Sequence, residues 1–291
     1  MNEELIRERL KNNLHVSGDV ITSVLQELKV KSRVSLMSQD AFIKVCRPKE
    51  EKYYRSLQNE VMIYENYAHF YVKIPELLYS YFDPENQLCI IATRKIDGQP
   101  LGTKRDSFSI LPQADFNEIA KKIEHIKCFP IMENWDRKFD RKVKMEEYIQ
   151  KVSELIDVKL VGQIKEICRS KRNNPSVFFT HGDLIPSNIM IDRNDNFWFI
   201  DWEWATNRTE YFDIALFTLF SDLPINGLKK IQQIASDHTM LAEMYCDSIL
   251  ISLREIKNWM QILEHSSRKN ECMGYWKDVL KESVSCLMLL W

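Results

Sequence analysis

Three polar side chains in the range 183–201 have the types and spacing that phosphoryl transfer to an alcohol requires. Asp183 and Asn188 stand in the segment His-Gly-Asp-Leu-Ile-Pro-Ser-Asn, and Asp201 stands in Phe-Ile-Asp-Trp-Glu. This reaction needs a carboxylate that orients and deprotonates the acceptor hydroxyl, and it needs oxygen ligands for the Mg²⁺ that bridges the nucleotide phosphates. A single such residue between two strands usually caps a turn, but the three together favour a phosphotransfer site.

These segments resemble the signature of the aminoglycoside phosphotransferase and choline kinase superfamily, a bacterial small-molecule kinase branch of the protein-kinase-like proteins. The resemblance implies that Asp183 is the catalytic base, Asn188 a Mg²⁺ ligand and Asp201 the principal Mg²⁺ ligand. It gives His181 a structural role, in which the residue holds the loop by hydrogen bonds. It also implies ATP as the phosphoryl donor, with GTP as the alternative, and Mg²⁺ as the cofactor.

The resemblance predicts a lysine and an acid nearer the amino terminus, and the sequence has both. Lys44 lies in the apolar segment Ala-Phe-Ile-Lys-Val, where an unpaired lysine would be unusual. In the helix expected to follow, Glu60 shares an apolar stripe with Leu57, Val61 and Tyr64. We therefore expect Lys44 to reach the nucleotide phosphates and to pair with Glu60.

The segment 90–98, Ile-Ile-Ala-Thr-Arg-Lys-Ile-Asp-Gly, resembles the hinge of this superfamily, where backbone groups bind the adenine edge. By position, the carbonyl of Arg94 and the amide of Ile96 would face the base. An edge strand that ends in a turn fits the same residues. The turn that corresponds to the glycine-rich loop of protein kinases has no glycine, and we expect Ser32 to donate to a phosphate there and Arg33 to add positive charge.

The chain departs from protein kinases downstream of the first motif. Asp201-Trp-Glu replaces their Asp-Phe-Gly, and no Ala-Pro-Glu segment follows, so a small-molecule acceptor is favoured over a protein. The spacing from Asp201 to Asp213 matches choline and ethanolamine kinases, whereas His-Gly-Asp matches aminoglycoside enzymes. Asn207 stands one place earlier than the asparagine usual in choline kinases, and Arg208 occupies its position. Asp213 matches an aspartate shared by the superfamily and is expected to anchor the catalytic loop.

We favour choline or another amino alcohol as the hydroxyl acceptor, because aromatic side chains in the second half of the chain could hold a trimethylammonium group through cation–π contacts. Each of these aromatic residues could instead belong to the core. The expected acceptor residues are Glu203, Trp204, Tyr211, Tyr245 and Trp259, with Trp202 as a further aromatic candidate.

An aminoglycoside or another sugar is the alternative acceptor. A polycation would favour an acidic groove, for which the candidates are Glu203, Glu210, Asp222, Glu243 and Asp247. A basic stretch is expected to form a solvated helix face, or alternatively to assist an anionic sugar; its residues are Arg137, Lys138, Arg141, Lys142 and Lys144.

The elements expected to position these residues follow from hydrophobic periodicity and turn residues. They form a small β-rich part followed by a larger helical part with a few strands. The expected elements are an amphipathic helix over 1–13, an antiparallel meander over 20–45 that begins with a strand at 20–30, a helix over about 51–68, a strand pair within 75–93, helices over 113–172, strands within 176–201 and helices over 211–291.

This order predicts a bilobal protein-kinase-like α+β fold over the whole chain. Residues 1–95 would form the nucleotide-binding amino lobe, and residues 96–291 the catalytic and acceptor-binding helical lobe. A pseudokinase that only binds nucleotide is the alternative of another class, and the presence of all the predicted catalytic and metal-binding residues argues against it. The sequence leaves the oligomeric state open.

The composition excludes several other classes of protein. The 291 residues carry 40 Lys and Arg against 42 Asp and Glu, so a basic surface for nucleic acid is not expected. With 7 glycines, neither a P-loop nor a dinucleotide-binding motif can be written. No apolar run approaches the roughly 18 residues of a membrane span. Because the 7 cysteines form no Cys-x-x-Cys pair and no signal segment is evident, we expect a cytoplasmic protein with reduced thiols.

Overall fold

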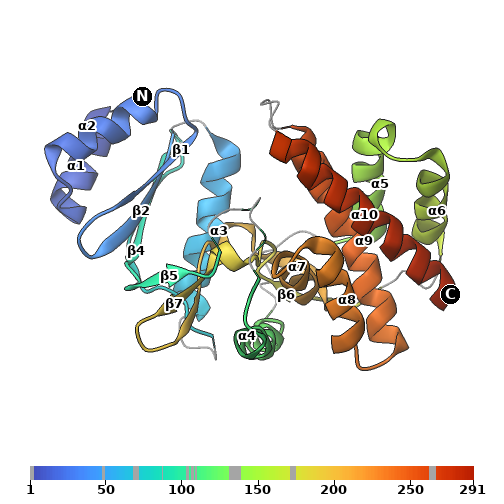
Figure 1. Cartoon of the computed structure of the whole chain (residues 1–291). Coiled ribbons are helices and arrows are strands. Elements are labelled where there is room, and N and C mark those ends of the chain that lie inside the picture. The colour runs from blue at the N-terminus through green and yellow to red at the C-terminus, as the bar shows by residue number, and fades with distance from the viewer. Residues whose placement is uncertain are drawn as a thin grey trace. The chain divides into compact units, whose positions relative to one another are not determined.

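The chain divides into two compact units (Figure 1). The first comprises Met1–Gln99 and Met190–Ala205, and the second comprises Pro100–Ile189 and Thr206–Trp291. A small antiparallel sheet in the first unit and a mostly helical second unit confirm the expected α+β class. This computed structural model describes residues 3–47, 50–67, 72–86, 88–102, 105, 108, 110–130, 139–170, 175–261 and 267–291.

The core of the first unit is a four-stranded antiparallel sheet with the strand order β1-β2-β4-β3. Its strands are β1 (Arg33–Met37), β2 (Ala41–Cys46), β3 (Leu77–Asp83) and β4 (Leu88–Arg94). The two middle strands bury side chains on both faces, as their apolar sequences require. The strand pair predicted within 75–93 is therefore present as β3 and β4.

Helices cover both faces of this sheet (Figure 1). On one face, α1 (Glu3–Leu14) and α2 (Gly18–Glu27) share a hydrophobic core with Ile43 of β2. On the other face, α3 (Glu51–Tyr67) packs against Cys46 of the same strand. Successive side chains of a strand point to opposite faces of the sheet. Side chains of β2 therefore pack alternately against α1 and α2 on one face and against α3 on the other.

The strand predicted over 20–30 is wrong, because Gly18–Glu27 form the helix α2. The β-branched residues of this segment favour a strand. However, Ile21, Val24 and Leu25 follow helical spacing and are buried against the sheet. Packing of this apolar stripe outweighs the local preference, since tertiary packing supplies most of the stability of a helix in a protein.

A three-stranded sheet has the order β5-β7-β8 and consists of β5 (Gly98–Pro100), β7 (Ile189–Asp192) and β8 (Phe197–Phe199). A Cβ atom at Gly98 would collide with the backbone of Ile191. Only glycine permits this approach, because any other residue carries a Cβ atom. Gly98, the last residue of the hinge-like segment 90–98, is therefore fixed by close packing against a strand.

The second unit is mostly helical. β6 (Val177–Thr180) and β9 (Thr206–Thr209) pair antiparallel, and the long helix α9 (His238–Met260) buries charged as well as apolar side chains, among them Arg254 and Glu255. The predicted helical regions of this part of the chain are confirmed for the described residues. Its other helices are α4 (Gln113–Ile126), α5 (Arg141–Val152), η1 (Ser153–Leu155), α6 (Val158–Arg169), α7 (Phe212–Phe220), α8 (Pro224–Ile234) and α10 (Ser267–Leu290).

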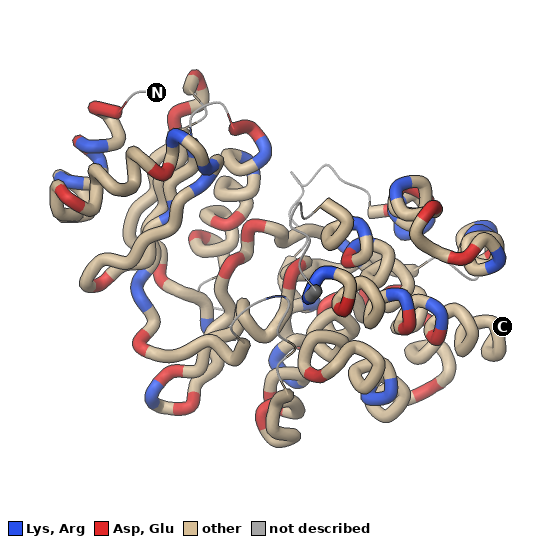
Figure 2. The backbone as a smooth tube through the Cα atoms, turned by 45° about the horizontal axis from the view of Figure 1, so that its top comes forward, with Lys and Arg blue, Asp and Glu red and all other residues tan. Residues whose placement is uncertain are grey.

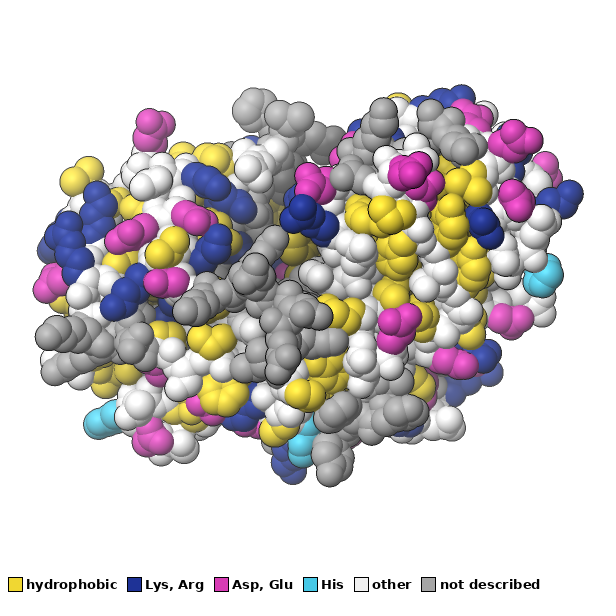
Figure 3. All heavy atoms as spheres, turned by 180° about the vertical axis from the view of Figure 1, so that it is seen from behind, with side chains coloured by type: hydrophobic (Ala, Val, Ile, Leu, Met, Phe, Trp, Pro, Cys, Tyr) yellow, Lys and Arg dark blue, Asp and Glu magenta, His cyan; other side chains and the backbone are white. Residues whose placement is uncertain are grey.

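Charged residues of both signs are interspersed along both units (Figure 2), as the net charge of −2 leads one to expect. On the face drawn in Figure 3, short apolar bands lie among charged and polar side chains. Among the described residues, no helix combines the length and the apolar character that a membrane crossing needs. Ligand selection is therefore expected to depend on local clusters of charge rather than on a long-range field.

The basic stretch predicted as a solvated helix face is only partly solvated. Lys144 is exposed and pairs with Glu147, as a surface residue would. Arg141, however, is buried at the start of α5, which corrects the prediction for this residue. Arg137 and Lys138 lie outside the described residues.

Arg141 is buried because α9 supplies carboxylates for it. Its Nη1 lies 2.8 Å from Oε2 of Glu243 and 3.2 Å from Oδ1 of Asp247. The hydroxyl of Thr209 donates to the same oxygen of Asp247 at 2.7 Å. Burial raises the pKa of Asp247 to about 6, although Arg141 opposes this rise. The sequence could not show this pairing, because the partners are more than 100 positions away.

Replacing Arg141 with Met is expected to lower the free energy of unfolding by about 3–5 kcal/mol, because Asp247 would remain buried without its cation. Urea denaturation followed by tryptophan fluorescence measures the loss. The double variant Arg141→Met/Asp247→Leu should recover most of it, since apolar residues of similar volume can replace a buried ion pair. An equal loss in the single and double variants would contradict this account.

Candidate active site

Lys44 contacts two carboxylates inside the first unit. Its position in β2 places it on the sheet face that α3 covers. Its Nζ lies 2.9 Å and 2.7 Å from the two carboxylate oxygens of Glu60, and 2.5 Å from Oδ1 of Asp201. The side chains of Lys44 and Glu60 are only 6 % and 1 % exposed, and the hydroxyl of Tyr64 also donates to Glu60. The expected pairing of Lys44 with Glu60 is therefore present.

Two further charged residues belong to this cluster. Arg33 donates to the carboxylate of Glu203, which is almost fully buried. Burial alone would lower the pKa of Lys44, but Glu60, Asp201 and Glu203 together raise it above its ordinary value. Burial, and then repulsion by Asp201, raise the pKa of Glu203 to about 7. Three carboxylates thus share two cations, in a cluster where Lys44, Glu60 and Glu203 are buried and Arg33 and Asp201 are partly exposed.

The donor set of this cluster fits a divalent cation. Glu60, Asp201 and Glu203 each offer an oxygen within 4.8 Å of the oxygens of the other two. Carboxylate oxygens are the ligands that Mg²⁺ takes in proteins, usually one or two of them together with substrate phosphates. Lys44 and Arg33 bring two positive charges to these three carboxylates, so the five residues together carry an excess of negative charge. A bound Mg²⁺ would offset that excess.

Asp201 has a left-handed backbone conformation, with φ 65° and ψ 54°. Few residues other than glycine adopt it, although aspartate does so more readily than most. The conformation turns the chain from β8 into the short helix η3 (Trp202–Trp204). Trp202 is fully buried there, and its Nε1 donates to the carbonyl of Phe199 at 2.9 Å. Trp202 is therefore a core residue that fixes the turn, and it cannot form part of an acceptor cage.

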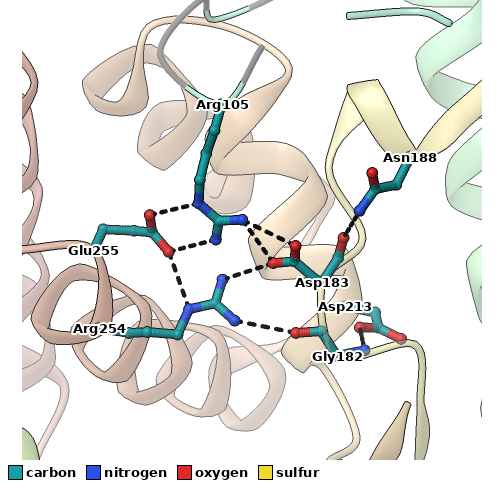
Figure 4. Close-up of polar contacts among 7 residues, drawn as sticks. All are labelled: Arg105, Gly182, Asp183, Asn188, Asp213, Arg254 and Glu255. Carbon is teal, nitrogen blue, oxygen red and sulfur yellow. Dashed lines mark hydrogen bonds and ion pairs between the residues drawn. The ribbon is translucent and has the colours of Figure 1, made fainter. Parts of the chain in front are cut away.

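The loop after β6 presents the second group of predicted residues, inside the second unit (Figure 4). Gly182 has φ 79°, which favours glycine. The buried carboxylate of Asp213 accepts from the backbone N–H group of His181 at 2.6 Å and from that of Gly182 at 3.0 Å. Nδ2 of Asn188 donates to the carbonyl of Asp183 at 2.8 Å, which leaves its Oδ1 for another partner. The loop is thus held at both ends around Asp183.

Two arginines orient the carboxylate of Asp183 (Figure 4). Nη1 of Arg105 lies 2.9 Å from each of its oxygens, and Nη2 of Arg254 lies 3.5 Å from Oδ1. The buried Glu255 accepts from Arg105 at 2.9 Å and 2.7 Å and from Arg254 at 3.0 Å. Arg254 also donates to the carbonyl of Gly182 at 3.1 Å. This network fixes both the side chain and the backbone of the predicted base.

Sequence reasoning did not identify Arg105, Arg254 or Glu255 as part of the site. Arg254 and Glu255 interrupt the apolar run Ile-Leu-Ile-Ser-Leu-Arg-Glu-Ile, and charged residues inside a buried run are usually paired. That signal could have identified them. Arg105 gives no such signal, because its own segment is polar. Burial would raise the pKa of Glu255, but the two arginines lower it below its ordinary value, so Glu255 holds them as an anion.

Three further residues predicted to bind the nucleotide lie in the first unit, where Arg94 is exposed and Ile96 and Ser32 are half-buried. The amide of Arg94 donates to the carbonyl of Glu76 at 2.8 Å, and its side chain pairs with the same residue at 2.6 Å. The backbone of Ile96 makes no hydrogen bond within the described residues, so its amide can meet a ligand. The carbonyl of Ser32 accepts from Arg47 at 2.8 Å. The contacts of Arg94, Ile96 and Ser32 with a nucleotide stay predictions.

The structure does not bring Tyr245 and Trp259 together. Both lie on α9, about four turns apart, which is about 21 Å along the helix axis. Tyr245 is buried, and its hydroxyl accepts from Gln232 at 2.8 Å. Burial raises the pKa of Tyr245 to about 12. The two rings therefore cannot both contact one acceptor of the size of choline.

The other two aromatic candidates each have a protein cation near the ring. Nζ of Lys127 lies 5.6 Å from the ring centre of Tyr211 in the second unit. Trp204 belongs to the first unit, is 38 % exposed, and has Nζ of Lys52 at 5.3 Å from its ring centre. Among the described residues of either unit, the candidate aromatic side chains therefore do not form a cage.

The acidic residues considered for a polycationic acceptor are each paired with a basic side chain. Glu243 and Asp247 share one arginine, however, and Glu203 belongs to the cluster with an excess of negative charge. The pairs are Glu203 with Arg33, Glu210 with Lys127, Asp222 with Lys230, and both Glu243 and Asp247 with Arg141.

Comparison with known proteins shows which family the chain matches. The family model described as choline/ethanolamine kinase matches residues 101–274, more than half of the chain. No curated protein matches the chain. The chain is similar in fold to several solved structures with the expected protein-kinase-like fold, all of low sequence identity.

One is the GDP complex of aminoglycoside 2′-phosphotransferase-IIIa, at 16 % identity and a TM-score of 0.59, covering 94 % of this chain and 99 % of that one. Choline kinase LicA from Streptococcus pneumoniae is 14 % identical, with a TM-score of 0.61 and coverage of 96 % and 99 %. A mutant of aminoglycoside phosphotransferase APH(4)-Ia with ADP and hygromycin B is 11 % identical, with a TM-score of 0.57 and coverage of 91 % and 97 %.

Proposed function

Because the chain belongs to the choline/ethanolamine kinase family and is thus a small-molecule kinase, we propose that it transfers the γ-phosphoryl group of ATP to a hydroxyl of an amino alcohol, with Mg²⁺. The observation that carries this proposal is the contact of buried Lys44 with both Glu60 and Asp201. A lysine held by a helix glutamate and placed beside a metal-binding aspartate is what kinase chemistry requires. GTP is the alternative donor, as the neighbour crystallised with GDP suggests.

In this proposal the nucleotide is held by the residues predicted for it. Lys44 donates to the phosphates, Ser32 adds a hydroxyl donor, and the backbone of Arg94 and Ile96 meets the adenine edge. Asp201 and Asn188 would hold Mg²⁺ through their oxygens, and the bound ion would supply positive charge against the negative charge that develops on the phosphoryl group.

Asp183 acts on the acceptor. It accepts a hydrogen bond from the hydroxyl and takes its proton as the hydroxyl oxygen bonds to phosphorus and the bond from phosphorus to the ADP oxygen breaks. Arg105 and Arg254 hold the carboxylate in one orientation, and Glu255 holds both arginines. Each carboxylate oxygen has more than one lone pair, so it can accept from Arg105 and from a hydroxyl together.

The family supports an amino alcohol as the acceptor, although the aromatic cage expected for choline is not formed by the predicted residues. An aminoglycoside is the second candidate, on the strength of the neighbour bound to hygromycin B. The pairing of every candidate acidic residue with a basic one favours the amino alcohol over a polycation. A pseudokinase is not favoured, because the sequence has Lys44, Asp183 and Asp201.

A nucleotide-consumption screen tests the proposal. The purified protein is given MgATP or MgGTP with amino alcohols, aminoglycosides or free sugars, and Asp183→Asn serves as the blank. We expect ADP to form with at least one amino alcohol above the rate of the blank. Consumption only with aminoglycosides would replace the proposed acceptor class. No acceptor-dependent consumption, with MgADP still bound, would point to the pseudokinase.

Asp201→Ala is expected to weaken Mg²⁺-dependent nucleotide binding more than Asn188→Ala does. A carboxylate brings a full charge to the cation, whereas an amide brings only a dipole. Isothermal titration of ADP into each variant at increasing Mg²⁺ measures the difference, with binding in EDTA as the reference. The opposite ranking would contradict the assignment of Asp201 as the principal ligand.

A further inference from the structure

Arg208 is a cation without a partner in the second unit. It lies in β9, opposite Phe178 of β6. Its Nε is buried and makes no hydrogen bond, and no ion pair or other polar contact of its side chain occurs within the described residues. The guanidinium lies 4.3 Å above the ring of Phe212, which fixes its plane but supplies no counter-charge. Arg208 as a whole is half-buried, but its buried Nε–H has lost water without gaining a hydrogen-bond acceptor, which is costly.

The charged groups around Arg208 come from several elements. Arg254 of α9 lies over the same Phe212 ring, at 5.6 Å, so two guanidinium groups share one aromatic side chain. Tyr148 of α5 is also close, and Lys257 lies 5.1 Å from its ring centre. Burial, and then repulsion by Arg254, lower the pKa of Arg208 to about 10.

The neighbouring carboxylates make no hydrogen bond or ion pair with Arg208 and are held by other groups. Asp213 accepts from two backbone N–H groups of the catalytic loop. Asp183 accepts hydrogen bonds from Arg105, and its Oδ1 lies 3.5 Å from Nη2 of Arg254. Both influence Arg208 only through their charge. Beside the predicted base, Arg208 is therefore the arginine that no carboxylate of the described residues contacts, and it lies on the side formed by α5, α7 and α9.

We propose that the acceptor alcohol carries an anionic group, a carboxylate or a phosphate, that pairs with Arg208. This inference rests on the proposed kinase function and narrows its acceptor. An amino alcohol with an acid group would place its hydroxyl at Asp183 and its anion on Arg208, while Arg105 and Arg254 remain engaged with Asp183 and Glu255. Phe212 holds the guanidinium ready for that anion, which reduces the conformational cost of binding.

Matched acceptors that differ by one acid group test the proposal. Ethanolamine is compared with serine, and choline with carnitine, for the carboxylate; glycerol is compared with glycerol 3-phosphate for the phosphate. We expect kcat/KM of the wild-type protein to be about 10- to 100-fold higher for the anionic member of at least one pair, as one charge-assisted pairing allows. Preference for the uncharged member in all three pairs would overturn the proposal.

Substitution of Arg208 separates acceptor binding from other roles. Arg208→Gln should remove the preference for the anionic member, with kcat/KM for the uncharged member and KM for the nucleotide near wild type. Arg208→Lys should keep part of the preference. Lys144→Gln, which removes an exposed positive charge of the same unit, is the control and should change nothing. An equal loss for both members would instead assign Arg208 to the transferred phosphoryl group, or to the fold, and would overturn the proposal.

A binding measurement keeps the two proposals apart if none of these acceptors is consumed. With saturating MgADP, inorganic phosphate should raise the melting temperature of the wild-type protein and not that of Arg208→Gln. That result would support the anion site while the kinase assignment failed. No phosphate effect in the wild-type protein, or the same effect in both proteins, would overturn the anion site.

Discussion

Asp183→Asn is expected to reduce kcat by about 10²- to 10⁴-fold, the usual contribution of a general base. Asparagine has the size of aspartate but cannot take the proton of the hydroxyl. The fold should survive, because Glu255 still holds Arg105 and Arg254, and Asn188 bonds to the backbone rather than to the side chain of this residue. Steady-state kinetics at saturating MgATP measure the effect, on the acceptor that the screen identifies.

Two measurements control this result. MgADP affinity and the urea midpoint should both stay close to wild type, which would separate lost chemistry from lost structure. Turnover within a few-fold of wild type would mean that Asp183 does not act as a base. Its contacts with Arg105 and Arg254 would then be purely structural, and positioning alone would drive the reaction.

The sequence predicted those parts of the site that depend on short-range spacing. Asp183 and Asn188 belong to one loop, so their five-residue spacing fixes their relation once the loop is held by Asp213. Lys44 and Glu60 were predictable for another reason. An isolated lysine in an apolar strand and an acid on the apolar stripe of the next helix both need a buried partner.

The residues that hold the carboxylate of Asp183 could not be predicted in the same way. Arg105 and Glu255 lie 150 positions apart along the chain, and their contact depends on where α9 passes the catalytic loop. The same limit applies to Arg141, whose basic neighbours suggested a solvated face, although α9 supplies its partners. Local patterns cannot show which polar positions of one helix will meet another.

In α2, by contrast, the local sequence favoured a strand, and packing against the sheet outweighed that preference. Ile21 and Val24 are β-branched, yet their helical spacing buries them against the sheet. The aromatic acceptor candidates failed for a related reason. Trp202 and Tyr245 are large apolar residues in the catalytic half of the chain, and burial in the core accounts for both of them. The residue types alone could not separate a ligand cage from a core.

Lys44→Met is expected to reduce kcat/KM for MgATP by about 10²- to 10³-fold, the range found when one preorganised donor is removed from a site of developing charge. It should also weaken the fold, because Glu60 and Asp201 would lose the cation that they share with Glu203. Breaking a buried ion pair from one side costs about 3–5 kcal/mol of unfolding free energy. Mg²⁺ should return part of that stability, since its charge can replace the ammonium among the carboxylates.

A double-mutant cycle decides whether Lys44 and Glu60 act as a unit. Lys44→Met and Glu60→Leu should each destabilise the protein, and the double variant should lose far less than the two losses combined, because neither buried charge is then left alone. The coupling is expected to be about 0.5–3 kcal/mol in urea denaturation. Lys52→Met, which removes an exposed lysine at the start of α3, is the matched control and should show no coupling to Glu60→Leu. Additive losses in the first cycle would mean that the pairing contributes nothing to the folded state, and the kinase assignment would lose the observation that carries it.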